Sequence, residues 1–402
     1  MEYIYIFFIL FGPKIGTYID TSILANICVI FILTRKENYT IVIDARVKRL
    51  LEGLAAILVY SILISIVNTH IDVVFYGRMV RTLCSICGLW VFISKSGCSK
   101  TRIEEVLTNI LIIHAIVIII SAVFYTDMQE RLRWFTAYDK HVRQYRSTGL
   151  MAGFDMAGLL CNIGIVLVLI RKEFNIVRYV IFSIAVMFTS RFSLVSYIVL
   201  TSMYLLFMRN SSILIIKKVV LLATLIPIAL FGLCVFSLTT TNTLLSGNAS
   251  WISTHFPQIY NWAYNVDDAF ARSDGQFVFN QQFQLSSDLF ELLFGKGVYG
   301  GGDPGYTRFI NAIGITGIIA VFIWHIRLLN TILKTKSTIE ENSIKKFKLL
   351  CFSLIIIGLN FKNSYFFTGT FFEVMLLMLF PYLLDDSNKI SDSEATICKK
   401  YP

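Results

Sequence analysis

The chain has 402 residues, of which 56% are hydrophobic and only 15% are charged. Soluble domains carry about 25% charged residues, so the composition argues against a soluble globular protein. The net charge of +10 does not indicate a nucleic-acid partner, because the basic residues lie in short connections between apolar runs. The composition therefore predicts an integral membrane protein.

Apolar runs close to the ~20 residues needed to cross a bilayer recur along the whole chain. Backbone groups inside a bilayer must be satisfied within the segment, so we predict an all-α polytopic protein with about twelve transmembrane helices in a single transmembrane domain. The predicted helices are residues 3–12, 18–34, 49–67, 74–94, 104–124, 149–170, 178–190, 192–208, 217–238, 306–328, 349–361 and 365–384. The start of the chain contains Glu2 and lacks a basic region, so we expect it to be retained and not cleaved.

The basic residues predict how these helices are oriented. If the N-terminus is cytoplasmic, the connections on the cytoplasmic side and the tail 385–402 together hold 23 of the 36 Lys and Arg residues. Basic residues near helix ends resist translocation, so we expect both termini in the cytoplasm.

Two connections on the opposite side are long, and we expect function to concentrate there. Residues 125–148 have a net charge of +2 and include Arg143, whereas residues 239–305 have a net charge of −4 and are rich in aromatic side chains. These rings can stack on sugars or seat helices at the bilayer surface, and the sequence leaves both interpretations open.

The cysteines do not predict a metal site. Cys84 and Cys87 form a CxxC, but it lies in an apolar run and lacks the second pair of ligands that a zinc site needs. We therefore expect neither a metal nor a cofactor.

The glycine-rich segment RSTGLMAGFDMAGLL contains Arg146 and Asp155. Arg146 is expected at the outer mouth of a helix, where it either holds a phosphate with two hydrogen bonds or anchors the helix end. Asp155 is expected about two turns into that helix, where a carboxylate must pair with a cation or line a wet cavity.

The segment TSRFSLVSY places Arg191 between two short apolar runs that look like a hairpin bending at the outer face. Arg146 and Arg191 on one membrane face would suit a pyrophosphate, because a guanidinium stays charged and offers planar donors. A structural anchor is the alternative for Arg191 as well.

A third candidate site lies in FGKGVYGGGDPGYTRFINAIGITG, residues 294–317. Asp303 either caps a helix that begins at Pro304 or acts as a general base toward a sugar hydroxyl. The glycines do not match a nucleotide-binding P-loop and more readily let the backbone approach a sugar or phosphate.

Lys362 lies between the last two predicted helices on the outer side, and Glu373 lies about two turns into the final one. These side chains either face the cavity that Arg191 would line or form ordinary structural contacts. In the second case Glu373 would pair with Arg78 or Arg81.

Together these motifs resemble the Wzy-type O-antigen polymerases of the bacterial inner membrane. The resemblance rests on R-x-x-G at residue 146, S-R-F-S at residue 190, and F-G-x-G, D-x-G-Y and G-I-x-G within residues 294–317. The related O-antigen ligases usually carry H-N-x-Y-L where this chain has Asp303 and the four residues after it, and that difference favours a polymerase.

The resemblance implies a metal-independent glycosyltransferase that joins oligosaccharide repeat units carried on undecaprenyl pyrophosphate at the periplasmic face. Arg146 and Arg191 would neutralise the pyrophosphate, and Asp303 would activate the acceptor hydroxyl. The remaining residues expected to bind substrate are Asp155, Tyr306, Arg308, Lys362 and Arg143.

The implied partners are lipid-linked oligosaccharides and membrane lipids, with a chain-length regulator and a flippase as further candidates. An O-antigen ligase and a capsule or exopolysaccharide polymerase remain open as alternatives. A flippase for lipid-linked oligosaccharides is less favoured, because the two halves of the chain show no related pattern.

Overall fold

The computed structural model describes residues 1–15, 19–35, 43–124, 128–129, 131–132, 146–151, 153–207, 285–300, 305–360, 365–367 and 369–400. In these residues the fold is all-helical apart from one small sheet, formed by β1 (Lys14–Ile15) and β2 (Ile19–Asp20). The chain divides into two compact units. Unit 1 combines residues 1–12, 20–105 and 276–402, and unit 2 combines residues 13–19 and 106–275.

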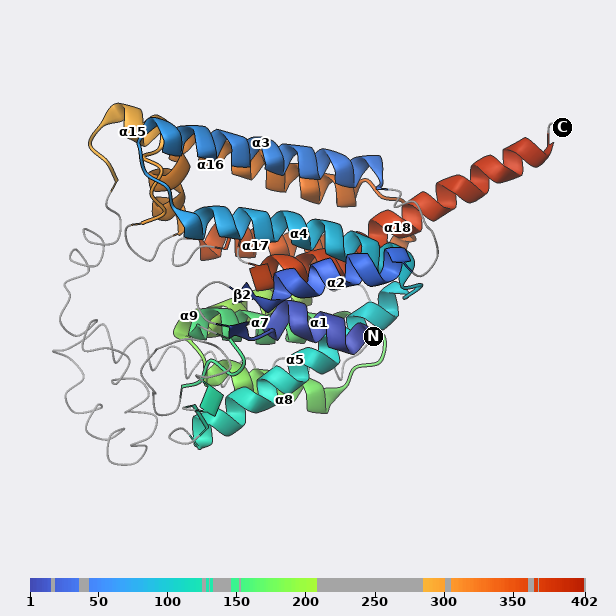
Figure 1. The fold of residues 1–402 in the computed structure, drawn as a ribbon. Coiled ribbons are helices and arrows are strands. Elements are labelled where there is room, and N and C mark those ends of the chain that lie inside the picture. Colours follow the sequence, from blue (N-terminus) through green and yellow to red (C-terminus); the bar gives the residue numbers. More distant parts are fainter. Residues whose placement is uncertain are drawn as a thin grey trace, which may run out of the picture. The chain divides into compact units, whose positions relative to one another are not determined.

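Unit 1 brings helices from both ends of the sequence together (Figure 1). Its helices are α1 (Glu2–Phe11), α2 (Thr21–Arg35), α3 (Ala45–Val67), α4 (Val73–Lys95), α15 (Leu289–Phe294), α16 (Gly305–Leu333), α17 (Ile339–Leu359) and α18 (Gly369–Lys400). Helix α4, from the first quarter of the chain, packs against the C-terminal helix α18, and α3 packs along α16. The core of unit 1 is therefore built by pairing distant parts of the chain.

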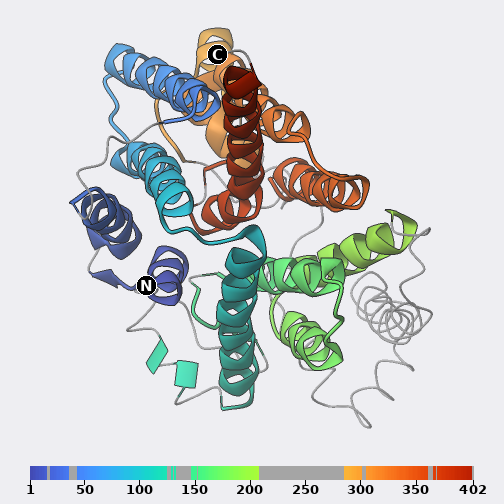
Figure 2. The same ribbon diagram turned by 90° about the vertical axis from the view of Figure 1, so that its right-hand side faces the viewer.

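Unit 2 is organised around α7 (Phe154–Ile170), which packs against α8 (Ile176–Met187) and α9 (Arg191–Phe207), and these three helices lie together in Figure 2. Every residue of α7 from Ala157 onward is buried. Gly158 lies against Ser193 and Thr189, and no Cβ would fit there. The close approach of α7 to Thr189 and Ser193 therefore depends on Gly158. The boundary with unit 1 falls within α5 (Lys100–Val123).

The described helices indicate a membrane protein. Four of them, α3, α4, α5 and α16, are long and apolar enough to cross a bilayer, and five more are apolar but shorter, with 10–17 residues. The predicted helix at 217–238 lies outside the described residues, so the number of twelve stays a prediction. The predicted hairpin at Arg191 is present, because α8 and α9 are joined by only three residues.

Two predicted boundaries are wrong. We expected one helix to end at residue 328 and the next to begin at residue 349, but α16 continues to Leu333 and α17 begins at Ile339, where the Thr338 side chain caps it by accepting the Glu341 N–H. The end of the expected loop 239–305 also forms the short helix α15, which packs against α16. Charged residues in the first turns of α17 hid its start from a search for apolar runs, and α15, with six residues, is too short for such a search.

Candidate functional site

A break in α16 organises the end of unit 1 at which this helix begins. Gly314 has φ 69° and ψ 179°, which interrupts the helical hydrogen bonding. The freed carbonyls accept other donors: Asn311 O accepts the N–H of Lys296 at 2.8 Å, and Ala312 O accepts that of Gly297 at 3.2 Å. The segment after α15 is therefore fastened to the break by backbone hydrogen bonds, as non-helical backbone in a membrane protein requires.

Two glycines make this junction possible. Gly295 also has a positive φ, 92°, and it faces the backbone of Ala312 and Gly314 so closely that no Cβ would fit. From α3, the Tyr60 hydroxyl contacts the carbonyls of Phe294 and Ile313, each at 3.2 Å. This explains the F-G-x-G and G-I-x-G patterns, because both supply residues to one backbone-to-backbone contact.

The fastened segment places Tyr299 between two arginines. Arg78 of α4 donates from Nη1 to the Tyr299 hydroxyl at 3.0 Å, and its guanidinium carbon lies 4.9 Å from the ring centroid. Arg308 of α16 lies 5.8 Å from the same centroid. The ring also stacks on Phe75, and Asp72 accepts the Tyr299 N–H at 2.9 Å. Tyr299 is thus held rigidly while both arginines stay partly exposed.

This arrangement can bind an anion. A guanidinium is always charged and presents planar donors that match phosphate oxygens. Within the described part of the chain, Arg78 forms no ion pair, so its charge is available to a ligand. The distribution of basic residues predicts that this end of α16 faces away from the cytoplasm, so we call Arg78, Tyr299 and Arg308 the outer arginine cluster.

A second arginine of α4 has a structural role. Arg81 lies 3.3 Å from the fully buried carboxylate of Glu373 on α18, and the Ser85 hydroxyl donates to the same carboxylate at 2.7 Å. Of the two alternatives for Glu373, the structure thus shows the pairing with Arg81. Gly369 lies against the Arg81 guanidinium, leaving no room for a Cβ, so the pair also fixes how α18 begins.

In unit 2, Arg146 is buried within protein and does not extend along an exposed helix end. It is 8% exposed, its Nε donates to the Thr189 carbonyl at 3.0 Å, and its guanidinium lies 5.1 Å from the Phe154 ring centroid. The neighbouring Ser147 N–H donates to the Phe188 carbonyl at 2.8 Å. Arg146 therefore holds the turn between α8 and α9.

Arg191 directly follows that turn and begins α9. The Ser190 hydroxyl accepts the N–H of Ser193 at 3.1 Å and so caps α9, which places Arg191 in the first turn of the helix. The Arg146 side chain thus contacts the turn that directly precedes Arg191. The structure does not describe the Arg191 side chain.

The expected depth of Asp155 is wrong. We placed it two turns into a helix beginning at residue 149, but α7 begins at Phe154 after a segment in which Gly149 has φ 52°. Asp155 therefore lies in the first turn and is partly exposed. A carboxylate there is stabilised by the helix dipole, which removes the reason to expect a deeply buried charge.

The other predicted residues divide into two groups. Tyr306 lies in the first turn of α16, but its hydroxyl donates to the Ile357 carbonyl at 2.5 Å, so its visible contact joins α16 to α17. Asp303, Lys362 and Arg143 lie outside the described residues. Because Asp303 directly precedes Pro304 and α16, the chain itself keeps it within a few residues of Arg308.

The sequence motifs did not indicate a binding role for Arg78 or Tyr299. Two signals were available: Arg78 and Arg81 are spaced three apart, so they share one helix face, and Tyr299 lies two residues after the FGKG motif. In the described ranges, no group of three or more His, Cys, Asp or Glu side chains could hold a metal ion.

Comparisons with known proteins do not identify a family. No protein-family model matches the chain, and no curated protein matches it significantly.

Proposed function

We propose that this protein is a membrane glycosyltransferase of the O-antigen polymerase type, acting on oligosaccharides linked to undecaprenyl pyrophosphate at the periplasmic face of the inner membrane. The observation that carries the proposal is the outer arginine cluster, in which Arg78 and Arg308 flank Tyr299 beside the segment containing Asp303. The resemblance to Wzy-type polymerases implies a substrate linked to pyrophosphate, whose negative charge would match the positive charge of these arginines.

The reaction transfers a glycosyl group without a metal or a nucleotide. The acceptor hydroxyl oxygen forms a bond to the anomeric carbon while the bond from that carbon to the phosphate oxygen breaks, and the pyrophosphate leaves with the electron pair. Negative charge grows on the leaving group, so arginines fixed beside it stabilise the transition state more than the ground state. Asp303 is the candidate base for the proton that the acceptor hydroxyl loses.

The geometry adds Arg78 to the residues that the sequence indicated. Arg78 and Arg308 are held by the Tyr299 ring, so they keep their positions while a ligand binds. Arg146 and Arg191 keep a proposed role at the pyrophosphate, although the Thr189 contact gives Arg146 a positioning function as well. Tyr306, Asp155, Lys362 and Arg143 remain candidates for substrate contacts.

The test is the lipopolysaccharide ladder of cells that lack this protein and carry either the wild type or a variant. The variants are Arg78→Gln, Arg308→Gln and Asp303→Asn, with the exposed Lys346→Gln as a matched control. Membrane levels of each are measured by immunoblot. We expect deletion to leave lipid A core capped by one repeat unit, and only the control and the wild type to restore the ladder.

Other ladders would decide between the alternatives. Loss of even the single-unit band on deletion points to a ligase or a flippase and contradicts the proposal. If the Arg78→Gln and Arg308→Gln variants are as abundant as the wild type and both give a normal ladder, the outer arginine cluster takes no part in the reaction. A surface polysaccharide that shortens while the lipopolysaccharide stays unchanged would assign the protein to a capsule or exopolysaccharide pathway.

A further inference from the structure

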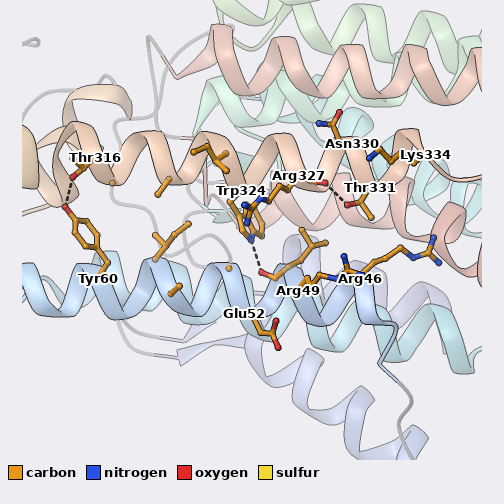
Figure 3. Close-up of a pocket in the computed structure, with 17 residues that line it drawn as sticks. Arg46, Arg49, Glu52, Tyr60, Thr316, Trp324, Arg327, Asn330, Thr331 and Lys334 are labelled. Carbon is orange, nitrogen blue, oxygen red and sulfur yellow. Dashed lines mark hydrogen bonds between the residues drawn. The ribbon is translucent and has the colours of Figure 1, made fainter.

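A groove runs along the interface of α3 and α16, within unit 1 and separate from the outer arginine cluster. It has a volume of about 910 Å³ and is lined by both helices (Figure 3). Small residues open it: Gly53 and Ala56 come from α3, and Gly317 and Ala320 come from α16. Both helices are candidate membrane spans, so the groove lies along a face that lipid can reach.

The two ends of the groove differ in chemistry. At one end Tyr60 and Thr316 hydrogen-bond to each other at 2.7 Å, which closes the groove with neutral groups. At the other end, where α3 begins and α16 ends, the lining includes four cations and a single carboxylate. The cations are Arg46, Arg49, Arg327 and Lys334, and the carboxylate is Glu52, as Figure 3 shows.

Most of this positive charge is not neutralised by the protein. Arg46 pairs with Asp44 at 2.8 Å and with Asp386 at 2.7 Å, so its charge is satisfied. Arg49, Arg327 and Lys334 are exposed, and none of them forms an ion pair with any residue that the structure describes. Three cations without an ion-pair partner among the described residues therefore lie at one end of the groove.

The groove is long enough for a lipid acyl chain. Arg49 and Tyr60 are 11 residues apart on α3, which corresponds to about 16 Å along the helix axis. An acyl chain extends through about half of the ~30 Å hydrocarbon layer, so this distance suits one chain. By the distribution of basic residues, its charged end is predicted to face the cytoplasm.

We propose that this groove binds one anionic phospholipid from the leaflet that its basic end faces. The lipid phosphate lies between Arg49, Arg327 and Lys334, and an acyl chain runs along the small residues toward Tyr60. Basic pockets between transmembrane helices recognise anionic headgroups in this way. The proposal does not depend on the glycosyltransferase activity, because the groove shares no residue with the outer arginine cluster.

The test uses the full-length protein purified in a neutral detergent and titrated with phosphatidylglycerol or phosphatidylcholine, with bound lipid measured by native mass spectrometry. The test variant is Arg49→Gln/Arg327→Gln. The matched control is Lys336→Gln/Lys346→Gln, which removes the same charge from exposed lysines outside the groove. Ala320→Trp fills the apolar part without changing charge.

We expect phosphatidylglycerol to bind in preference to phosphatidylcholine, and the Arg49→Gln/Arg327→Gln variant to bind it about 30-fold more weakly. Ala320→Trp should weaken binding as well, whereas the control should stay within about 3-fold of wild type. Unfolding temperatures equal to that of wild type would show that the variants are folded.

Four results would overturn the proposal. They are equal binding of both lipids, an equal loss in the control, no effect of Ala320→Trp, and displacement of the lipid by an equimolar amount of inorganic phosphate. If the wild-type protein is instead a dimer that Ala320→Trp dissociates, the groove holds a second copy of the chain.

Discussion

The Arg81–Glu373 pair joins α4 to α18, and replacing one partner should destabilise unit 1 strongly. The Glu373 side chain is 0% exposed and that of Arg81 is 13% exposed, so neither ion regains full hydration if its partner is lost. Removing one partner of a buried ion pair lowers the free energy of unfolding by about 3–5 kcal/mol, because the other charge stays buried without a partner. Replacing both partners by apolar groups of similar size costs little. We therefore predict a large coupling energy between the two positions.

The experiment is a double-mutant cycle with Arg81→Met, Glu373→Met and the double variant, in which the free energy of unfolding is measured in mixed micelles. Each single variant should lose about 3–5 kcal/mol, and the double variant should lie within about 1 kcal/mol of wild type. The control cycle uses Lys48 and Glu52, an exposed pair 3.9 Å apart, whose coupling should be about 0.3–0.5 kcal/mol. Additive losses at Arg81 and Glu373 would refute this reasoning.

Three further predictions concern the backbone, the topology and the tail. Gly314→Ala should cost about 1–3 kcal/mol because of its positive φ, whereas Gly358→Ala, with open space around it, should be neutral or slightly stabilising in the same unfolding assay. Cys98 lies between α4 and α5, so an impermeant maleimide should label it only from the cytoplasm, and the rate should keep rising above pH 9.0, because the thiolate is the reacting form and burial raises the pKa of this thiol above 9.0. At Asp386, burial raises the carboxyl pKa, but hydrogen bonds from the Lys336 N–H and the Arg46 guanidinium outweigh this and hold it below the ordinary value of 3.8. Asp386→Asn should therefore be less stable than wild type at pH 7, and the difference should disappear only as the pH falls below 3.8.

The apolar pattern predicted most of the helices because each of them depends on local sequence. The runs that predict α3, α4 and α5 are long: the structure begins α3 and α5 four residues earlier than predicted and extends α4 by one residue at each end. The same pattern placed the start of α7 five residues too early. Apolar residues continue through Leu150 and Met151, and only the backbone at Gly149 and Gly153 shows that the helix has not begun.

The candidate site depends on pairings that no local pattern contains. Glu373 was recognised as a buried charge that needs a cation, and two arginines of α4 were possible partners. Choosing between them requires the register of α4 against α18, which places Arg81 at the carboxylate and turns Arg78 toward Tyr299. The glycines of residues 294–317 were recognised as permitting a close approach, yet their partner is the backbone of the break at Gly314.

The break in α16 also bears on where the outer arginine cluster lies relative to a bilayer. The 19 residues from 315 to 333 extend about 28 Å as a helix, which is close to the ~30 Å needed to cross the hydrocarbon without help from the residues before the break. The turns from Gly305 to Ile313 would then lie at or beyond the edge of the hydrocarbon. Arg308 belongs to those turns, and a guanidinium at that depth reaches water and lipid headgroups at little cost. The break at Gly314 thus divides α16 into a longer part that is long enough to span the membrane and a shorter part that holds Arg308 beside Tyr299.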